Sequence, residues 1–192
     1  MDDLDLAVEL INTLDIRAMP VDRLDSVEHF RVMLRGTGRV RLAGQLHDSD
    51  LPRLRWLRQQ LRAIFDTAEV ADAAHRMNTL LREIEVVPQL HASPHRGLAI
   101  GWGTNESGFS ELAARLVGAL AEHLIAHGTT RLGVCAAAPC RCVFVDRTRP
   151  GTRKYCKDAC NDRVAAAAYY YRRRAARSHE ALVPHELRPQ QR

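Results

Sequence analysis

Apolar side chains recur every three or four positions through most of the first 127 residues, with polar residues between them. This spacing places the apolar side chains on one face of an α-helix. It predicts five amphipathic helices joined by short polar segments. The predicted helices cover residues 4–14, 27–34, 51–65, 74–84 and 112–124.

Residues that favour helix ends lie at several of these boundaries. Asp2 and Asp3 precede the first helix, and acidic side chains stabilise a helix N-terminus. Asp25 and Glu28 have the spacing of a capping box, in which the two side chains accept hydrogen bonds from each other's backbone. The other boundary residues are Gly36 and Gly38 after the second helix, Asp50 and Pro52 at the third, Pro88 after the fourth and Gly128 after the last.

A short β-hairpin is predicted before the last of these helices. Residues 86–90 and 97–102 have the length of short strands, and the Ser93-Pro94 pair between them favours a turn. Hydrophobic residues make up 46% of the 192 residues but aromatic residues only 5%, a mixture that favours helices packed on helices. Residues 1–128 are therefore predicted to form a helical domain, which ends at residues 128–130.

All five cysteines lie between positions 135 and 160. No apolar run of about 18 residues occurs, and Asp2 and Asp3 stand where a secretory signal would carry positive charge. We therefore expect a cytoplasmic protein without a membrane partner. Because disulfides rarely persist in a reducing cytosol, metal binding is the expected role of the cysteines.

Four cysteines have the spacing C-x4-C-x15-C-x3-C, namely Cys135, Cys140, Cys156 and Cys160. Four thiolates satisfy the tetrahedral preference of zinc and leave no coordination position for water or substrate. The pattern therefore predicts one structural Zn²⁺. The alternative is that these are ordinary buried thiols, which the paired spacing disfavours.

The residues between the cysteine pairs predict a knuckle, a β-hairpin and a helix, in that order. Residues 135–140 form the knuckle, Val143–Val145 are strand formers, 148–151 favour a turn, and 153–155 can pair back with the first strand. Cys142 has two interpretations. It could replace Cys140 as a ligand, but a free thiol packed beneath the hairpin is favoured.

Positive charge is concentrated in the same part of the chain. Residues 135–177 contain eleven Lys and Arg against three Asp, which gives +8 locally and −3 elsewhere. Such an asymmetry predicts a polyanionic partner at one end of the chain.

A helix that starts near Asn161 can present this charge to a nucleic acid. One face carries Arg163, Ala167, Tyr170, Arg174 and Arg177, and another carries Val164, Ala168 and Tyr171, which can pack on the hairpin. The less favoured alternative is that these arginines only complement the helix dipole and keep the protein soluble. The candidate nucleic-acid-binding residues are Arg149, Arg153, Lys154, Arg163, Tyr170, Arg172, Arg173, Arg174 and Arg177.

The cysteine segment resembles the CGNR zinc finger family. The resemblance rests on Cys135-x4-Cys140, Phe144-Val145-Asp146, the run from Gly151 to Cys156, and Cys160-Asn161-Asp162-Arg163 before an arginine-rich helix. Residues 10–15 (LINTLD) also resemble the Asn-Thr motif of the family's N-terminal stress-response (ABATE-type) helical domain. The resemblance implies a transcriptional regulator with a zinc-dependent nucleic-acid-binding module.

Two positions depart from the motif that names the family. Asn161 stands where glycine is usual, and asparagine tolerates the left-handed backbone conformation that glycine adopts readily. Asp162 replaces an asparagine, so it adds a negative charge and loses an amide donor. This position therefore cannot make a contact to a phosphate or a base that requires the amide donor.

The predicted fold is mainly α. A helical domain with a small β-hairpin over residues 1–128 precedes a treble-clef-like zinc module over 131–177 and a flexible polar tail over 178–192. The expected partner is nucleic acid, with duplex DNA favoured. A homodimer and a small-molecule ligand are the two open roles for the N-terminal domain.

Other classes of function remain as alternatives. The zinc module could bind RNA or another protein without a role in transcription. An enzyme is disfavoured, although His123 and His127 are four residues apart beside Glu122. Asn12 and Thr13 are interpreted as hydrogen-bonding residues that end a helix or join it to its neighbour, in preference to ligand contacts.

Overall fold

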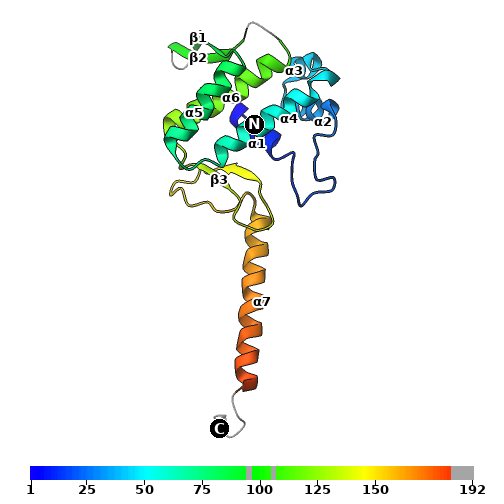
Figure 1. The fold of residues 1–192 in the computed structure, drawn as a ribbon, viewed down its shortest axis with the longest axis vertical. Coiled ribbons are helices and arrows are strands. Elements are labelled where there is room, and N and C mark those ends of the chain that lie inside the picture. Colours follow the sequence, from blue (N-terminus) through cyan, green and yellow to red (C-terminus); the bar gives the residue numbers. More distant parts are fainter. Residues whose placement is uncertain (94–96, 105–106, 183–192) are drawn as a thin grey trace. The chain divides into compact units, whose positions relative to one another are not determined.

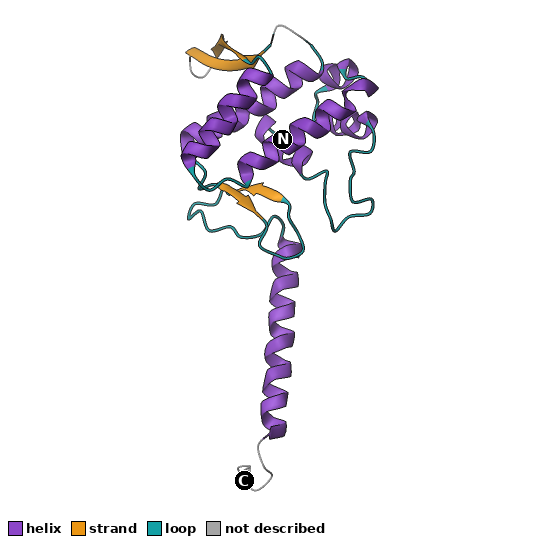
Figure 2. Cartoon of the chain, viewed as in Figure 1, coloured by secondary structure: helices purple, strands orange, loops and turns teal. Residues whose placement is uncertain are grey.

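Helices dominate the computed structural model, which describes residues 1–93, 97–104 and 107–182 (Figure 2). Its contacts divide the chain into two compact units, Met1–Cys156 and Lys157–Arg192. The predicted domains 1–128, 131–177 and 178–192 stay a prediction. No helix among the described residues is long and apolar enough to cross a membrane.

The core of the first unit surrounds its N-terminal helix. Helix α1 (Asp3–Ile11) packs against α6 (Phe109–His127) and α4 (Leu51–Phe65), and Leu6, Ala7 and Leu10 are fully buried (Figure 1). The other helices that contribute to this unit are α2 (Val27–Gly36), α3 (Val40–Gln45), the short 3-10 helix η1 (Asp48–Asp50) and α5 (Val70–Glu83). The predicted helices are therefore confirmed, whereas α3 is an element that the pattern did not predict.

The helix ends follow the sequence in part. Asp2 caps α1 in a capping box with Asp5, which agrees with the acidic helix N-terminus predicted from the sequence. The capping box predicted for Asp25 and Glu28 is wrong, because α2 begins after Ser26 and Glu28 binds Arg31 and Arg35 further along the helix. Helix α1 also ends at Ile11, before the predicted residue 14.

The predicted hairpin near the end of the helical domain is confirmed. Strands β1 (Val87–Ser93) and β2 (Gly97–Gly103) pair antiparallel, with Leu90 opposite Ile100. The proline of the predicted Ser93-Pro94 turn lies outside the described residues.

Trp102 of β2 lies against α6 at Gly118. A Cβ atom on Gly118 would come within 2.0 Å of Trp102 Cγ, so no larger residue fits without displacing the indole ring. We expect Gly118→Ala to lower the free energy of unfolding by about 1–3 kcal/mol through overpacking, although alanine favours helices. Urea denaturation measures the loss of stability, and tryptophan emission reports the displacement of the indole ring.

The matched control is Gly44→Ala in α3, where nothing lies within 4 Å of an added Cβ atom. That variant should be at least as stable as the parent protein, because alanine favours the helix and meets no neighbour there. Equal stability and unchanged tryptophan emission in Gly118→Ala would contradict the packing.

A second hairpin completes the first unit. Strands β3 (Leu132–Val134) and β4 (Val143–Val145) pair antiparallel, and the buried Val143 and Val145 belong to the same core as the helices. The predicted pairing of 143–145 with residues 153–155 is wrong. The knuckle reverses the chain directly, so the segments that flank it pair instead.

The second unit contains α7 (Asp158–Leu182). It begins three residues before the predicted start at Asn161. Its backbone is helical through Leu182, beyond Ser178, where the polar tail was predicted to begin. The rest of that tail, residues 183–192, lies outside the described residues.

Candidate metal centre and basic surface

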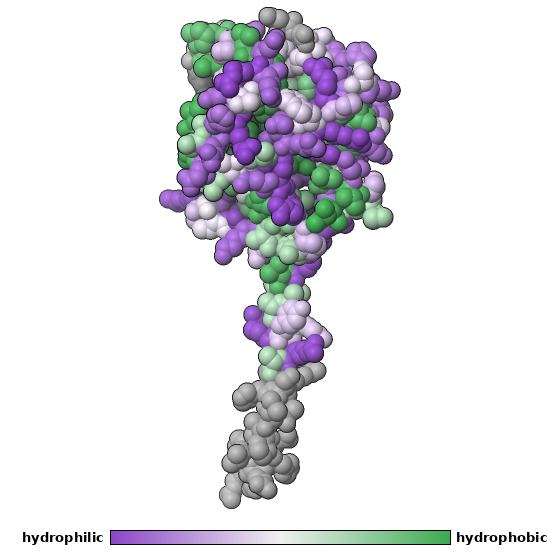
Figure 3. All heavy atoms as spheres, viewed as in Figure 1, coloured by the Kyte–Doolittle hydropathy of each residue, from purple (hydrophilic) through white to green (hydrophobic). Residues whose placement is uncertain are grey.

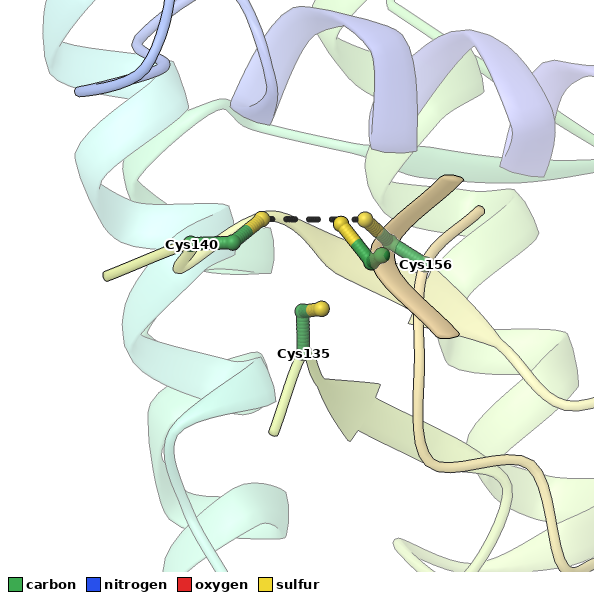
Figure 4. Close-up of side chains that lie close together, drawn as sticks. Cys135, Cys140 and Cys156 are labelled. Carbon is green, nitrogen blue, oxygen red and sulfur yellow. Dashed lines mark hydrogen bonds between the residues drawn. The ribbon is translucent and has the colours of Figure 1, made fainter. Parts of the chain in front are cut away.

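The four predicted ligands come together. The Sγ atoms of Cys135, Cys140, Cys156 and Cys160 all lie within 4.8 Å of one another, and the first three are shown in Figure 4. The Sγ atoms of Cys140 and Cys156 are 3.7 Å apart. Tetrahedral zinc with Zn–S distances of roughly 2.3 Å requires sulfur–sulfur separations of about 3.8 Å, so the thiols fit a zinc ion with little adjustment.

Backbone hydrogen bonds position these thiols. Cys135 directly follows β3, and its N–H group donates to the carbonyl of Cys142, 2.9 Å away, which extends the β3–β4 ladder. The N–H group of Cys140 donates to the carbonyl of Ala137 and closes the knuckle. Cys160 lies in the first turn of α7, four residues after Cys156.

The fifth cysteine is not a member of the group. Burial raises the pKa of Cys142 to about 12, and the neighbouring Cys140 and Asp15 add to this effect. Burial also acts to raise the pKa of Cys140, but hydrogen bonds from Cys142 and from Cys156 and Cys135 lower it to about 7. Cys142 is thus a buried thiol outside the group of four, in line with the favoured interpretation of a packed free thiol.

The buried carboxylate of Asp146, a motif residue for which no role was predicted, organises the loop between β4 and Cys156. Oδ1 of Asp146 accepts from the backbone and hydroxyl of Thr148, at 2.8 and 2.6 Å, and Oδ2 accepts from the N–H group of Arg153, at 2.8 Å. The hydrogen bond from Thr148 is the main cause that lowers the pKa of Asp146. The sequence signal was Asp146 itself, the one acidic residue between the two cysteine pairs.

Two candidate nucleic-acid-binding arginines have structural contacts. The guanidinium group of Arg153 donates to the carbonyls of Tyr155 and Cys156, and it lies 4.9 Å from the centre of the Phe144 ring. Nη2 of Arg163 lies 4.0 Å from the Sγ atom of Cys160, where it can offset thiolate charge. These contacts favour a role in building the module for both residues.

The other basic candidates are exposed. Arg149 and Lys154 lie on the loop after β4, and α7 presents Tyr170 with Arg172, Arg173 and Arg174. Arg177 is in α7, but its side chain lies outside the described part. Tyr171, which was expected to pack on the hairpin, is 68% exposed. The structure thus gathers exposed arginines along α7 without grouping all nine candidates.

Asn12 joins the N-terminal helix to the second hairpin. Its Nδ2 atom donates to the carbonyl of Val143 at 3.0 Å, and its Oδ1 atom accepts from the N–H group of Val143 at 2.8 Å. The adjacent Thr13 is held by the buried Arg58, which also forms two hydrogen bonds to Asp22. The predicted role of Asn12 and Thr13 as hydrogen-bonding residues at a helix end is confirmed.

The two candidate histidines of the enzyme alternative are adjacent. The ring centres of His123 and His127 are 4.8 Å apart, and burial, followed by the charge of His127, lowers the pKa of His123. Among the described residues, the four cysteines are the one group of three or more metal-binding side chains close enough to share an ion.

Comparison with known protein families gives one match for each of two parts of the chain. Residues 4–128 match the model of the ABATE family, described as "Putative stress-induced transcription regulator", and residues 131–173 match the CGNR zinc finger. A search of curated proteins gave no match. Because the first match covers more than half of the chain and the second covers the four-cysteine site, the protein belongs to the ABATE family and carries a CGNR zinc finger.

Proposed function

We propose that this protein is a transcriptional regulator that binds duplex DNA through a basic helix held by one structural zinc ion. The observation that carries the proposal is the exposed run Arg172, Arg173 and Arg174 on α7, the helix whose first turn contains the fourth candidate zinc ligand. Arginine side chains neutralise phosphates, and a helix of this width fits the DNA major groove.

Exposed tyrosines add to this surface. Tyr169, Tyr170 and Tyr171 immediately precede the three arginines, and Arg173 lies 5.9 Å from the centre of the Tyr169 ring. Ala165, Ala166 and Ala167 are exposed and small, so that part of α7 can approach a groove closely. Contacts of the arginines to phosphates would give affinity. Contacts of these tyrosines and alanines to base edges would give sequence preference.

The proposed zinc ion is structural, and we propose no catalytic role for it. Four thiolates fill the tetrahedral coordination of zinc and leave no open position for a substrate. When bound, the ion would cross-link the cysteines of the knuckle to the cysteine in the first turn of α7. Sensing of a small molecule by the N-terminal domain stays a prediction.

DNA binding is tested best on the full chain, because the β3–β4 hairpin belongs to the core of the first unit. We expect the zinc-loaded protein to bind a fluorescent duplex at low salt. The triple variant Arg172→Ala, Arg173→Ala, Arg174→Ala should bind at least tenfold more weakly. Its plot of log affinity against log salt concentration should be less steep by about 3, since three phosphate contacts are lost.

A control variant removes the same charge elsewhere. Arg35→Ala, Arg76→Ala and Arg82→Ala change exposed arginines of α2 and α5 and should leave the affinity and the salt slope nearly unchanged. Equal affinities of the two triple variants would refute the role of α7. Duplex RNA run in parallel separates the alternative of an RNA-binding module, and a failure to bind either duplex would favour a protein-interaction module.

A further inference from the structure

The β1–β2 hairpin exposes an unusually apolar face. In its register Leu90 is opposite Ile100 and Ala92 is opposite Leu98, so these side chains project from the same face of the sheet. Leu90, Leu98 and Ile100 are 69%, 63% and 55% exposed. Figure 3 shows apolar residues gathered at the upper left of the molecule, over this hairpin.

This apolar face continues into a groove between α5 and α6. Trp102 lies on the same face of the hairpin as Ile100, packs against Gly118 of α6 and lines the groove, which has a volume of about 240 Å³. The other main lining residues are Val70, Ala73, Met77, Leu81, Leu124 and Ile125. We call the groove and the apolar hairpin face together the hairpin–groove surface.

The chemistry of this surface limits what can cover it. Among the described lining residues of the groove none is charged, and the polar groups are the amide of Asn78 and the indole N–H of Trp102, which donates to Glu122 at the edge of the groove, 2.7 Å away. A site for a small ligand needs several placed polar groups to fix its orientation, and this groove lacks them. Residues near a two-fold axis meet copies of themselves, so like charges there oppose self-association. A groove whose described lining residues carry no charge avoids that repulsion on a chain of net charge +5.

The size of the surface suits a dimer. The exposed parts of the hairpin leucines and Ile100, with Val70 and the 81% exposed Ile125, amount to on the order of 600 Å² per copy, close to the roughly 800 Å² that each partner buries in a stable interface. Monomeric proteins rarely leave a contiguous apolar surface of this extent in water.

We propose that two copies of this chain associate about a two-fold axis through their hairpin–groove surfaces. The dimer goes beyond the proposed function, since it does not depend on DNA. It would give one particle two basic helices, the arrangement with which dimeric regulators contact two half-sites.

Sedimentation velocity of the zinc-loaded full chain, without DNA and over a concentration series, tests the dimer. We expect a concentration-dependent shift from monomer to dimer. Ile125→Asp and Leu98→Asp should each raise the dimer dissociation constant at least 100-fold, because each places two carboxylates in an apolar interface. Both side chains are exposed in the single chain, so the monomer should keep its circular dichroism spectrum and melting temperature.

A matched variant and a spectroscopic probe complete the test. Val40→Asp places the same charge on an equally exposed apolar residue of α3, 64% exposed, and should leave the dimer intact. In a Trp56→Phe background Trp102 is the one remaining tryptophan, and its emission should shift to the blue as the dimer forms.

A chain that stays monomeric at every concentration, or a dimer that tolerates both aspartates, would overturn the proposal. The result is separable from DNA binding, because the triple arginine variant of α7 should still dimerise.

Discussion

Cys140→Ser is expected to abolish stoichiometric zinc binding and to unfold the module around the knuckle. A structural zinc site contributes roughly 10 kcal/mol or more of binding free energy, which three remaining thiolates cannot retain. The loss should extend beyond the knuckle, because Val143 and Val145 lie in the same core as α1 and α4. We expect a lower thermal midpoint for the whole first unit, measured by circular dichroism, and a zinc content near zero by native mass spectrometry.

Cys142→Ser is the matched control. Cys142 is buried two residues away but lies outside the four-thiol group, so this variant should keep one zinc ion per chain and lose only a modest part of the stability. The opposite pattern, with zinc retained in Cys140→Ser and lost in Cys142→Ser, would mean that Cys142 is the ligand. Parent protein purified without stoichiometric zinc would remove the basis of the whole site.

The metal centre could be predicted from the sequence because its information is local. The cysteine pairs are separated by four and three residues, spacings that a knuckle and one helical turn impose directly. The same is true of α4, where Asp50 and Pro52 mark the start and leucines repeat on one face. Spacing within one short segment is sufficient for such elements.

Elements that depend on distant partners could not be predicted in this way. Strand β3 has three residues, too few to show a period of two. It pairs with β4 because the knuckle between them reverses the chain. Helix α3 has six residues and buries two of them, so it has no helical repeat. Glu28 has the spacing of a capping box, but the nearby Arg31 and Arg35 compete for its carboxylate, and their ion pairs replace the cap.

The contact between Asn12 and Val143 is the clearest case, because 131 residues separate its two partners. An Asn at the end of a helix has a sufficient local explanation as a cap, and nothing in its neighbourhood in the sequence indicates a strand. In the structure its amide matches both backbone groups of Val143, as a neighbouring strand would. The Asn-Thr motif of the helical domain therefore holds the hairpin of the zinc finger.

Asn12→Ala is expected to lower the free energy of unfolding by about 2–5 kcal/mol. It leaves the N–H group and the carbonyl of the buried Val143 without partners, and each buried unsatisfied group costs roughly 1–3 kcal/mol. Glu9→Ala, on the exposed side of the same helix, is the control and should change stability little. Urea denaturation measures both variants.

Amide hydrogen exchange distinguishes this contact from a general loss of stability. In Asn12→Ala the amide of Val143 should exchange much faster than in the parent protein, while the zinc content stays at one ion, because the thiolates do not depend on Asn12. Asn12→Asp keeps an acceptor for the N–H group but turns a carboxylate toward the carbonyl, so its Val143 amide should be protected better than in Asn12→Ala even if its stability is no higher. An unchanged exchange rate of Val143 in Asn12→Ala would show that the hairpin is held on the helical domain by apolar packing and by the metal alone.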